Sequence, residues 1–169
     1  MMKRYARRFT TLALSAAIGA CAVSPAGAQD VAEHPVKQVV SANPFGIMLE
    51  FYNAEYEHVA GESFTVGVGG SYFTPGNSTY LNIDGFWRFY PEEVPEPFNG
   101  WAFGLKAGLT NVDDRTYLGA GFDVNYSRLL GKDNNFYVSA GLGLKRLLGR
   151  DNGVRFIPTI RLINIGYAF

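Results

Sequence analysis

The C-terminal run Ile163–Phe169 constrains the fold more than any other feature of the chain. Alternation with a period of two is typical of a β-strand. An apolar face opposite a small or polar one suits a strand that has lipid on one side and a barrel lumen on the other. A terminal aromatic is typical of the closing strand of an outer-membrane barrel, so Tyr167 and Phe169 are predicted to be read by the outer-membrane assembly machinery. Ile163, Ile165, Tyr167 and Phe169 form the apolar set, and Asn164, Gly166 and Ala168 alternate with them.

The N-terminus has the layout of a secretory signal peptide. Lys3, Arg4, Arg7 and Arg8 precede the apolar stretch 9–23, and small residues lead to a predicted cleavage after Ala28. We therefore expect residues 1–28 to be removed, residues 29–38 to form a periplasmic tail and residues 39–169 to form the barrel. An alternative is that the segment before Cys21 is a lipobox, which would leave a lipidated Cys21 at the mature N-terminus.

Composition narrows the function classes. The whole chain has 15 basic and 15 acidic residues. Removal of the basic signal segment leaves a mature chain with a net negative charge, so its charge gives no support to nucleic-acid binding. The single cysteine lies in that segment. The mature chain is therefore expected to contain no disulfide.

Alternating patterns recur along the chain, and clusters of turn residues separate them. Both barrel termini must lie in the periplasm, so the number of strands is expected to be even, and the long stretch 38–59 is divided near 49–51. The prediction is an all-β, eight-stranded, antiparallel up-and-down transmembrane β-barrel. Its expected strands are 39–48, 52–59, 63–74, 79–90, 99–110, 116–129, 136–147 and 154–169.

Four segments carry a family resemblance: Asn43–Gly46, Asn53–Glu57, Phe86–Pro91 and, after it, Gly100–Gly104. The chain resembles the small outer-membrane proteins grouped as domain of unknown function 3575. The resemblance covers nearly the whole mature chain, and it implies the barrel fold and the outer-membrane location. It implies no chemistry, because the activity of that family is not established.

The sequence offers little for catalysis. A hydrolase or acyltransferase that acts on lipid needs a base beside its nucleophile. His34 is expected in the tail and His58 at a periplasmic strand end, where neither is placed for such a site. Metal ligands at characteristic spacing are also missing from the sequence. We therefore expect no catalytic residues, no metal, no cofactor and no soluble substrate.

Inward-facing charges are the most informative candidate site. By strand parity, acidic and basic residues alternate on successive strands and are expected to pair inside a narrow lumen. A second inward group joins two glutamates to an arginine. Either group could be a proton or ion path or a structural plug of ion pairs. The ladder is Asp84, Lys106, Asp123 and Lys145, and the second group is Glu55, Glu57 and Arg88.

Arginines cluster near the outward end of the last two strands. Arg146, Arg150, Arg155 and Arg161 are predicted to gather around a short loop. Guanidinium groups bind phosphate well, so the cluster is a candidate contact for lipopolysaccharide. The alternative is a basic loop that only keeps this end of the barrel solvated.

These features predict a non-enzymatic outer-membrane barrel of a Gram-negative-type envelope, with a packed polar lumen and a structural or surface and lipid-contact role. Membrane lipid, lipopolysaccharide and the assembly machinery are its expected partners. Two alternatives remain: an enzyme that modifies lipid A, and a secreted lipocalin-like carrier with the faces inverted, so that Trp101, Phe103 and Leu105 would be buried.

Overall fold

The computed structural model describes residues 36–74, 76, 78–91, 96–148 and 155–169, with Ile47, Leu49 and Arg155 described by backbone alone. The predicted signal peptide, Cys21, His34 and Arg150 lie outside the described residues. No helix among the described residues is long and apolar enough to cross a membrane.

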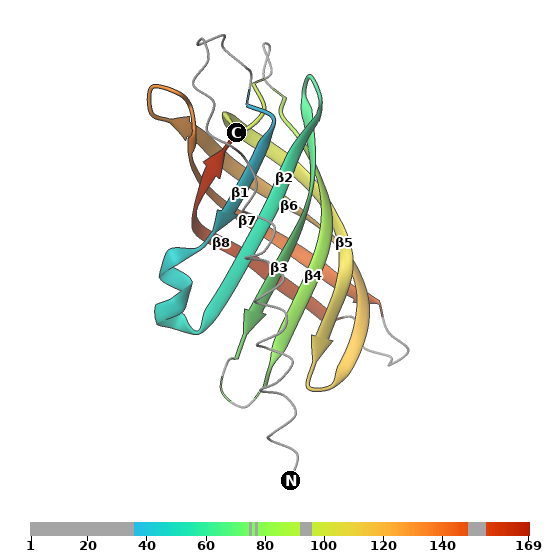
Figure 1. Ribbon diagram of the computed structural model, residues 1–169. Helices are drawn as coiled ribbons and strands as arrows, with labels where there is room; N and C mark the ends of the chain where they lie inside the picture. Colours follow the sequence, from blue (N-terminus) through green and yellow to red (C-terminus); the bar gives the residue numbers. More distant parts are fainter. Residues whose placement is uncertain (1–35, 75, 77, 92–95, 149–154) are drawn as a thin grey trace. The chain divides into compact units, whose positions relative to one another are not determined.

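Eight antiparallel strands form a closed barrel, in which each strand pairs with its neighbours in sequence and β8 returns to β1 (Figure 1). This confirms the predicted eight-stranded up-and-down fold. The strands are β1 Gln38–Ala42, β2 Phe51–Gly61, β3 Phe64–Phe73, β4 Tyr80–Phe89, β5 Gly100–Val112, β6 Arg115–Leu130, β7 Phe136–Leu148 and β8 Arg155–Ala168.

The chain enters and leaves the barrel at the same rim. The backbone N–H groups of Lys37 and Gln38 donate to the carbonyl oxygen of Phe169 at 3.1 and 2.9 Å, and the Phe169 N–H donates to the Gln38 carbonyl oxygen at 2.9 Å. Because successive strands are antiparallel, the connections after β2, β4 and β6 lie at this rim as well. We call it the terminal rim, and the opposite one the far rim.

The first strand is shorter than the sequence predicted. Instead of a strand over 39–48, β1 ends at Ala42 and a short 3-10 helix, η1 (Pro44–Leu49), leads to β2. The Asn43 side-chain oxygen caps η1 by accepting hydrogen bonds from the N–H groups of Phe45 and Gly46 at 2.9 and 3.0 Å. Pro44 has no N–H to offer to a strand ladder. The cap and the proline together end the strand early.

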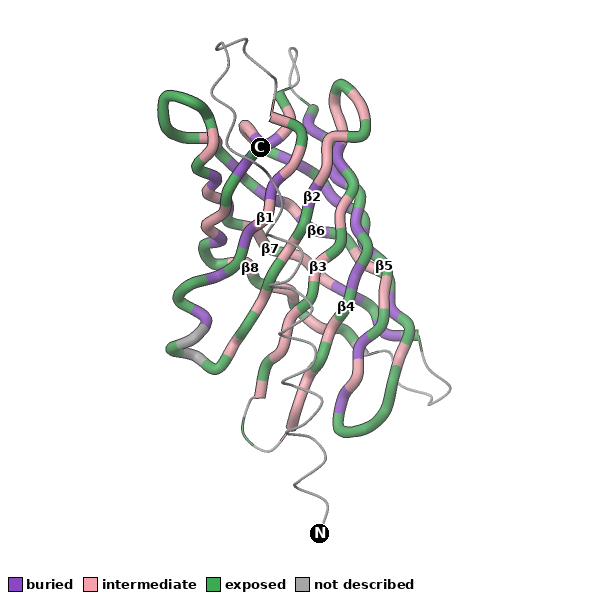
Figure 2. Tube along the Cα trace, viewed as in Figure 1, coloured by how far each residue is buried: buried purple, intermediate pink, exposed green. Residues whose placement is uncertain are grey.

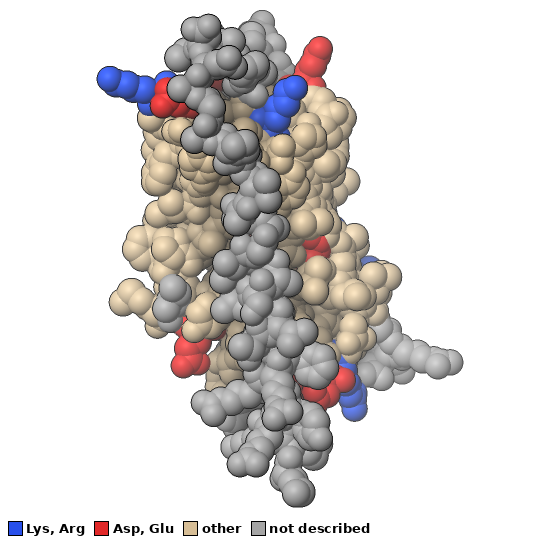
Figure 3. Space-filling view, viewed as in Figure 1, with Lys and Arg blue, Asp and Glu red and all other residues tan. Residues whose placement is uncertain are grey.

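Buried and exposed residues alternate along the strands (Figure 2). Large apolar side chains point outward, as at Ile83, Leu105 and Phe122, which are 59%, 62% and 55% exposed. On the face drawn in Figure 3, most of the visible charged side chains lie towards the two rims, and few lie between them. The lumen holds most of the buried polar groups, so the barrel has the reverse of the polarity of a water-soluble domain.

Candidate functional site: the lumen

Aromatic side chains fill the lumen at the terminal rim. Phe98 lies in the connection between β4 and β5, has a φ of 73° and is fully buried. Its ring meets the ring of Tyr137 edge-on, with the centroids 6.1 Å apart. Val39 and Ala168 complete this buried cluster. The lumen is therefore packed at this rim.

Arg88, on β4, is the centre of the charged layer above that cluster. Its side chain is fully buried, and its guanidinium pairs with Glu55 at 3.1 Å and with Glu57, both on β2. Its Nε lies 3.7 Å from a carboxylate oxygen of Asp123, and its guanidinium carbon lies 3.9 Å from the centre of the Phe86 ring. The structure thus brings together the predicted group of Glu55, Glu57 and Arg88.

Glu57 has two further partners. The hydroxyl of Thr65 donates to it, and the hydroxyl of Tyr90 donates to its Oε1 at 3.3 Å. Tyr90 follows β4 at the terminal rim, where burial raises the pKa of its hydroxyl well above the usual value. The hydroxyl therefore stays protonated and remains a donor to the carboxylate.

The four residues of the predicted ladder also share the lumen, but they pair differently. Lys106 contacts Asp123 at 3.3 Å, as expected for neighbouring strands. Asp84 pairs with Lys145 rather than with Lys106. β4 and β7 are three strands apart around the barrel, and an eight-stranded lumen is narrow enough for their side chains to meet inside it. The expectation of a ladder that alternates strand by strand was therefore wrong in its connectivity.

Neutral polar groups complete both lysine sites. Lys106 Nζ donates to the Thr159 hydroxyl at 2.6 Å. Lys145 Nζ donates to the Asn82 side-chain oxygen and to the Thr110 hydroxyl, each at 2.9 Å. Each ammonium group is held by a carboxylate and by at least one uncharged oxygen, so the burial of its charge is compensated.

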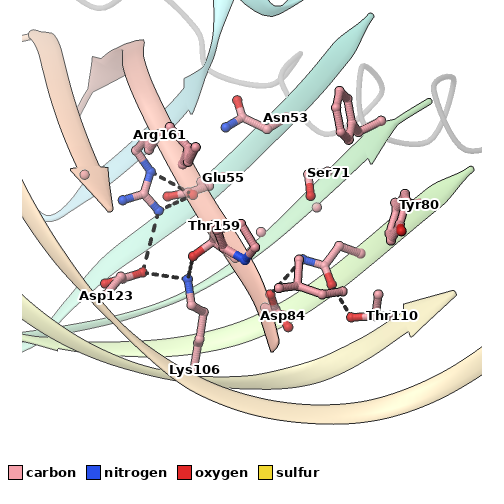
Figure 4. Close-up of a pocket in the computed structure, with 18 of the residues that line it drawn as sticks. Asn53, Glu55, Ser71, Tyr80, Asp84, Lys106, Thr110, Asp123, Thr159 and Arg161 are labelled. Atoms are coloured by element: carbon pink, nitrogen blue, oxygen red, sulfur yellow. Dashed lines mark hydrogen bonds and ion pairs between the residues drawn. The ribbon is translucent and has the colours of Figure 1, made fainter. Parts of the chain in front are cut away.

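Arg161 lies in the lumen. The prediction that it belongs to an arginine cluster near the outward end of the last two strands was therefore wrong. The Arg161 Nε donates to Glu55 at 3.0 Å (Figure 4), and its Nη1 donates to the Asn125 side-chain oxygen at 3.0 Å. The cause is a bulge in the β7–β8 ladder: Asn164 pairs with Ser139, but Arg161 pairs with Gly141. The extra residue on β8 inverts its alternation, so counting back from the C-terminus gave Arg161 the wrong face.

The remaining members of the arginine cluster do not form a described site. Arg146 is exposed on the outer face of β7. The side chain of Arg155 and the whole of Arg150 lie outside the described residues. Because Arg161 is inside, the structure does not bring the predicted four-arginine surface together.

The charges of the described lumen balance. Arg88, Lys106, Lys145 and Arg161 face the carboxylates of Glu55, Glu57, Asp84 and Asp123 through the contacts given above. Among the described residues, no group of His, Cys, Asp or Glu is arranged to hold a metal ion.

A cavity of about 480 Å³ occupies the lumen between this charged layer and the far rim. Its charged floor includes Glu55, Lys106 and Arg161 (Figure 4). Phe51 and Phe73 also line it. The sequence predicted a packed interior, so the cavity is a difference. The small inward residues Gly69 and Ser71 on β3 leave space that larger side chains would fill.

Comparison with known proteins adds little to this description. The chain matches no protein-family model and no curated protein. Among solved structures, it aligns with the N-terminal β-barrel domain of OprF from Pseudomonas aeruginosa. The TM-score is 0.46 with 14% sequence identity, over 79% of this chain and 97% of that chain.

Proposed function

We propose that this chain is a non-enzymatic integral outer-membrane β-barrel whose lumen is closed to ions and whose role is structural or in contact with membrane lipid. The observation that carries the proposal is the reversed polarity of the barrel. Exposed large apolar side chains surround a lumen in which buried charges are paired.

The exterior supports membrane insertion. Trp101, Phe103 and Leu105 are 56%, 52% and 62% exposed, whereas a lipocalin-like carrier would bury this face. Exposed aromatic rings also lie near the terminal rim, where Trp101 packs edge-on against Tyr126 and Tyr167 stacks on Phe169. Such rings are typical of the girdle at a membrane interface.

The lumen supports a barrel that does not conduct. Arg88, Tyr90 and Phe98 are fully buried across its terminal half. An ion would have to break paired charges and displace packed rings to pass, and leaving a buried charge unpaired is costly.

Location and partners follow from the sequence features together with this surface. The predicted signal peptide and the terminal Tyr167 and Phe169 support export to the outer membrane and recognition by its assembly machinery. Lipid, including lipopolysaccharide, is then the surrounding partner. Membership of the family that the sequence resembles is part of the same proposal.

The position of His58 supports a non-enzymatic role. Among the described residues it is the one histidine. It lies on β2 near the terminal rim, where its partners in the strand ladders are Gln38 on β1 and Val66 on β3. If this rim is periplasmic, His58 faces away from the outer leaflet that contains lipid A, so it is badly placed as a base for lipid A chemistry.

Fractionation and lipid analysis test the proposal together. After expression in a Gram-negative host, the protein should remain with outer membranes after carbonate extraction and should shift in mobility on a gel when it is heated. The mass spectrum of lipid A should match that of a host without the protein. Recovery in the soluble periplasm would contradict the membrane location, and a new lipid A mass that depends on this protein would contradict the non-enzymatic role.

A further inference from the structure

One edge of β8 is unpaired over much of its length. β8 spans Arg155–Ala168, but its ladder with β1 covers only Ile165–Ala168, because β1 ends at Ala42. Between 156 and 163, no strand in the described part of the chain pairs with this edge, although η1 contacts β8. Figure 1 shows η1 leaving the wall where β1 would otherwise continue. We call this break, between β8 156–163 and η1 with β2 51–53, the lateral opening.

Pro158 is suited to this free edge. Its partner on β7 is Leu144, whose carbonyl oxygen points towards Gly121 of β6. In an antiparallel ladder the N–H and C=O of one residue point to the same side, so Leu144 bonds to β6. The backbone N and O of Pro158 therefore point away from β7, into the lateral opening. A proline there offers no donor, as is typical of edge strands.

Side-chain contacts fix the end of the opening that is nearer to the terminal rim. The Asn53 amide nitrogen on β2 donates to the Asn164 side-chain oxygen on β8 at 3.3 Å. The Asn53 side-chain oxygen accepts a hydrogen bond from the backbone N–H of Asn43 at 2.8 Å. These bonds join β2 to β8 where β1 stops, so the opening has a defined boundary.

The lumen cavity reaches this free edge. Its lining includes Thr159 and Arg161 of β8 on one side of the break, and Phe51 and Asn53 of β2 on the other side. The cavity therefore lies directly inside the lateral opening.

The cavity has an amphipathic lining. Phe51, Phe73 and Phe156 are apolar. Ser71 and Tyr80 contribute hydroxyl groups (Figure 4). Among the described residues, neither hydroxyl has a hydrogen-bond partner. A strand edge at membrane depth also needs partners for its free backbone groups.

The charge of the floor selects the kind of head group. Lys106 and Arg161 are already paired with Asp123 and Glu55, so the floor has no excess charge of either sign. A charged head group would have to compete with these pairs, whereas an uncharged hydroxyl or ester group would meet the free hydroxyls. The volume of about 480 Å³ fits one small ligand rather than a whole membrane phospholipid.

We propose that the cavity binds the uncharged head group of a single-chain amphiphile, such as a monoacylglycerol, whose chain passes through the lateral opening into the membrane. The ligand enters sideways from the lipid, along β8 156–163. This inference rests on the proposed membrane location.

Photo-crosslinking in lipid nanodiscs tests the site. A monoacylglycerol with a diazirine close to its ester should crosslink to the segment 156–161 and to Ser71, well above the level given by a diacyl phospholipid with the same label. The matched fatty acid and alkylamine probes should crosslink there at least about tenfold less at equal concentration, corresponding to ~1.4 kcal/mol. Preference for either charged probe would overturn the assignment of an uncharged head group.

Two variants separate the cavity from the opening. Ser71→Leu fills the cavity and should lower monoacylglycerol crosslinking at least about tenfold. Leu81→Phe, which adds bulk on the outer face of β4, is the control and should change nothing. Asn43→Val/Pro44→Val removes the cap and the proline, so that β1 can continue along β8, and should also abolish crosslinking.

The outcomes can be told apart. Undiminished crosslinking in Ser71→Leu would overturn the site. Undiminished crosslinking in a double variant that keeps its heat-dependent gel shift would overturn lateral entry, and if that variant does not fold, Ser71→Leu decides. If the protein inserts into membranes but the monoacylglycerol probe labels it no more than the phospholipid probe does, this inference alone is contradicted. If the protein fails to insert, the proposed function is contradicted.

Discussion

At the scale of single residues, stability depends on a few buried charges that have no water to solvate them. Arg88 is the clearest case, since its fully buried side chain faces three carboxylates. Breaking a buried pair costs far more than losing a surface pair, because the remaining charge stays buried and unpaired.

Replacing Arg88 with Met should therefore destabilise the barrel by about 3 to 5 kcal/mol, because Glu57 is left buried without its counter-charge. Adding Glu57→Gln should restore part of the loss. Urea unfolding in lipid vesicles, followed by tryptophan fluorescence, measures both. Arg128→Met, at an exposed arginine on β6, is the control and should change stability by less than ~0.5 kcal/mol. Equal effects at both arginines would contradict the role of Arg88.

The two lumen lysines should differ in the same unfolding measurement. Lys145→Met leaves Asp84 without a cation and should cost about 3 to 5 kcal/mol. Lys106→Met should cost less, about 1 to 2 kcal/mol, because Asp123 still lies 3.7 Å from Arg88 and 4.0 Å from Arg161. A larger loss for Lys106→Met would mean that the observed pairing is wrong.

At the scale of elements, local irregularities decide which side chains enter the lumen. Regular alternation was enough to predict the faces of β4 to β7, and thereby the lumen positions of Asp84, Lys106, Asp123 and Lys145. It failed at β8, where the bulge inverts the alternation, and at β1, where η1 replaces half of a strand. The early end of β1 had a signal in the sequence, because Asn43 is a good helix cap and Pro44 cannot donate to a strand ladder. The bulge had no comparable signal, because Leu162 and Ile163 are both apolar and suit either phase.

The closing pair of strands depends on the last residue. Phe169 exchanges two backbone hydrogen bonds with Gln38 and accepts a third from Lys37. Deleting Phe169 removes these bonds together with the exposed terminal ring, so the truncated chain should be lost from the outer membrane and degraded in the periplasm. Quantitative immunoblots of both fractions measure this. Phe169→Tyr keeps the ring and the backbone and should preserve assembly, whereas normal outer-membrane levels of the truncated chain would contradict the role of this residue.

At the scale of the whole molecule, the barrel is divided along its axis. The half near the terminal rim is filled by rings and paired charges, and the half near the far rim encloses the cavity. The general architecture follows from alternation, an even strand count and the closing strand. The cavity could not be predicted, because it depends on how β1 stops and on which side chains meet across the lumen.

Electrical recording tests the closed lumen most directly. The purified barrel, inserted into a planar bilayer, should give no single-channel current in about 1 M salt, where the Debye length is about 3 Å. Phe98→Gly/Tyr137→Ala, which removes the rings at the terminal rim, should raise the leak if it folds. Stable unitary currents from the unmodified protein would contradict a sealed lumen and the account built on it.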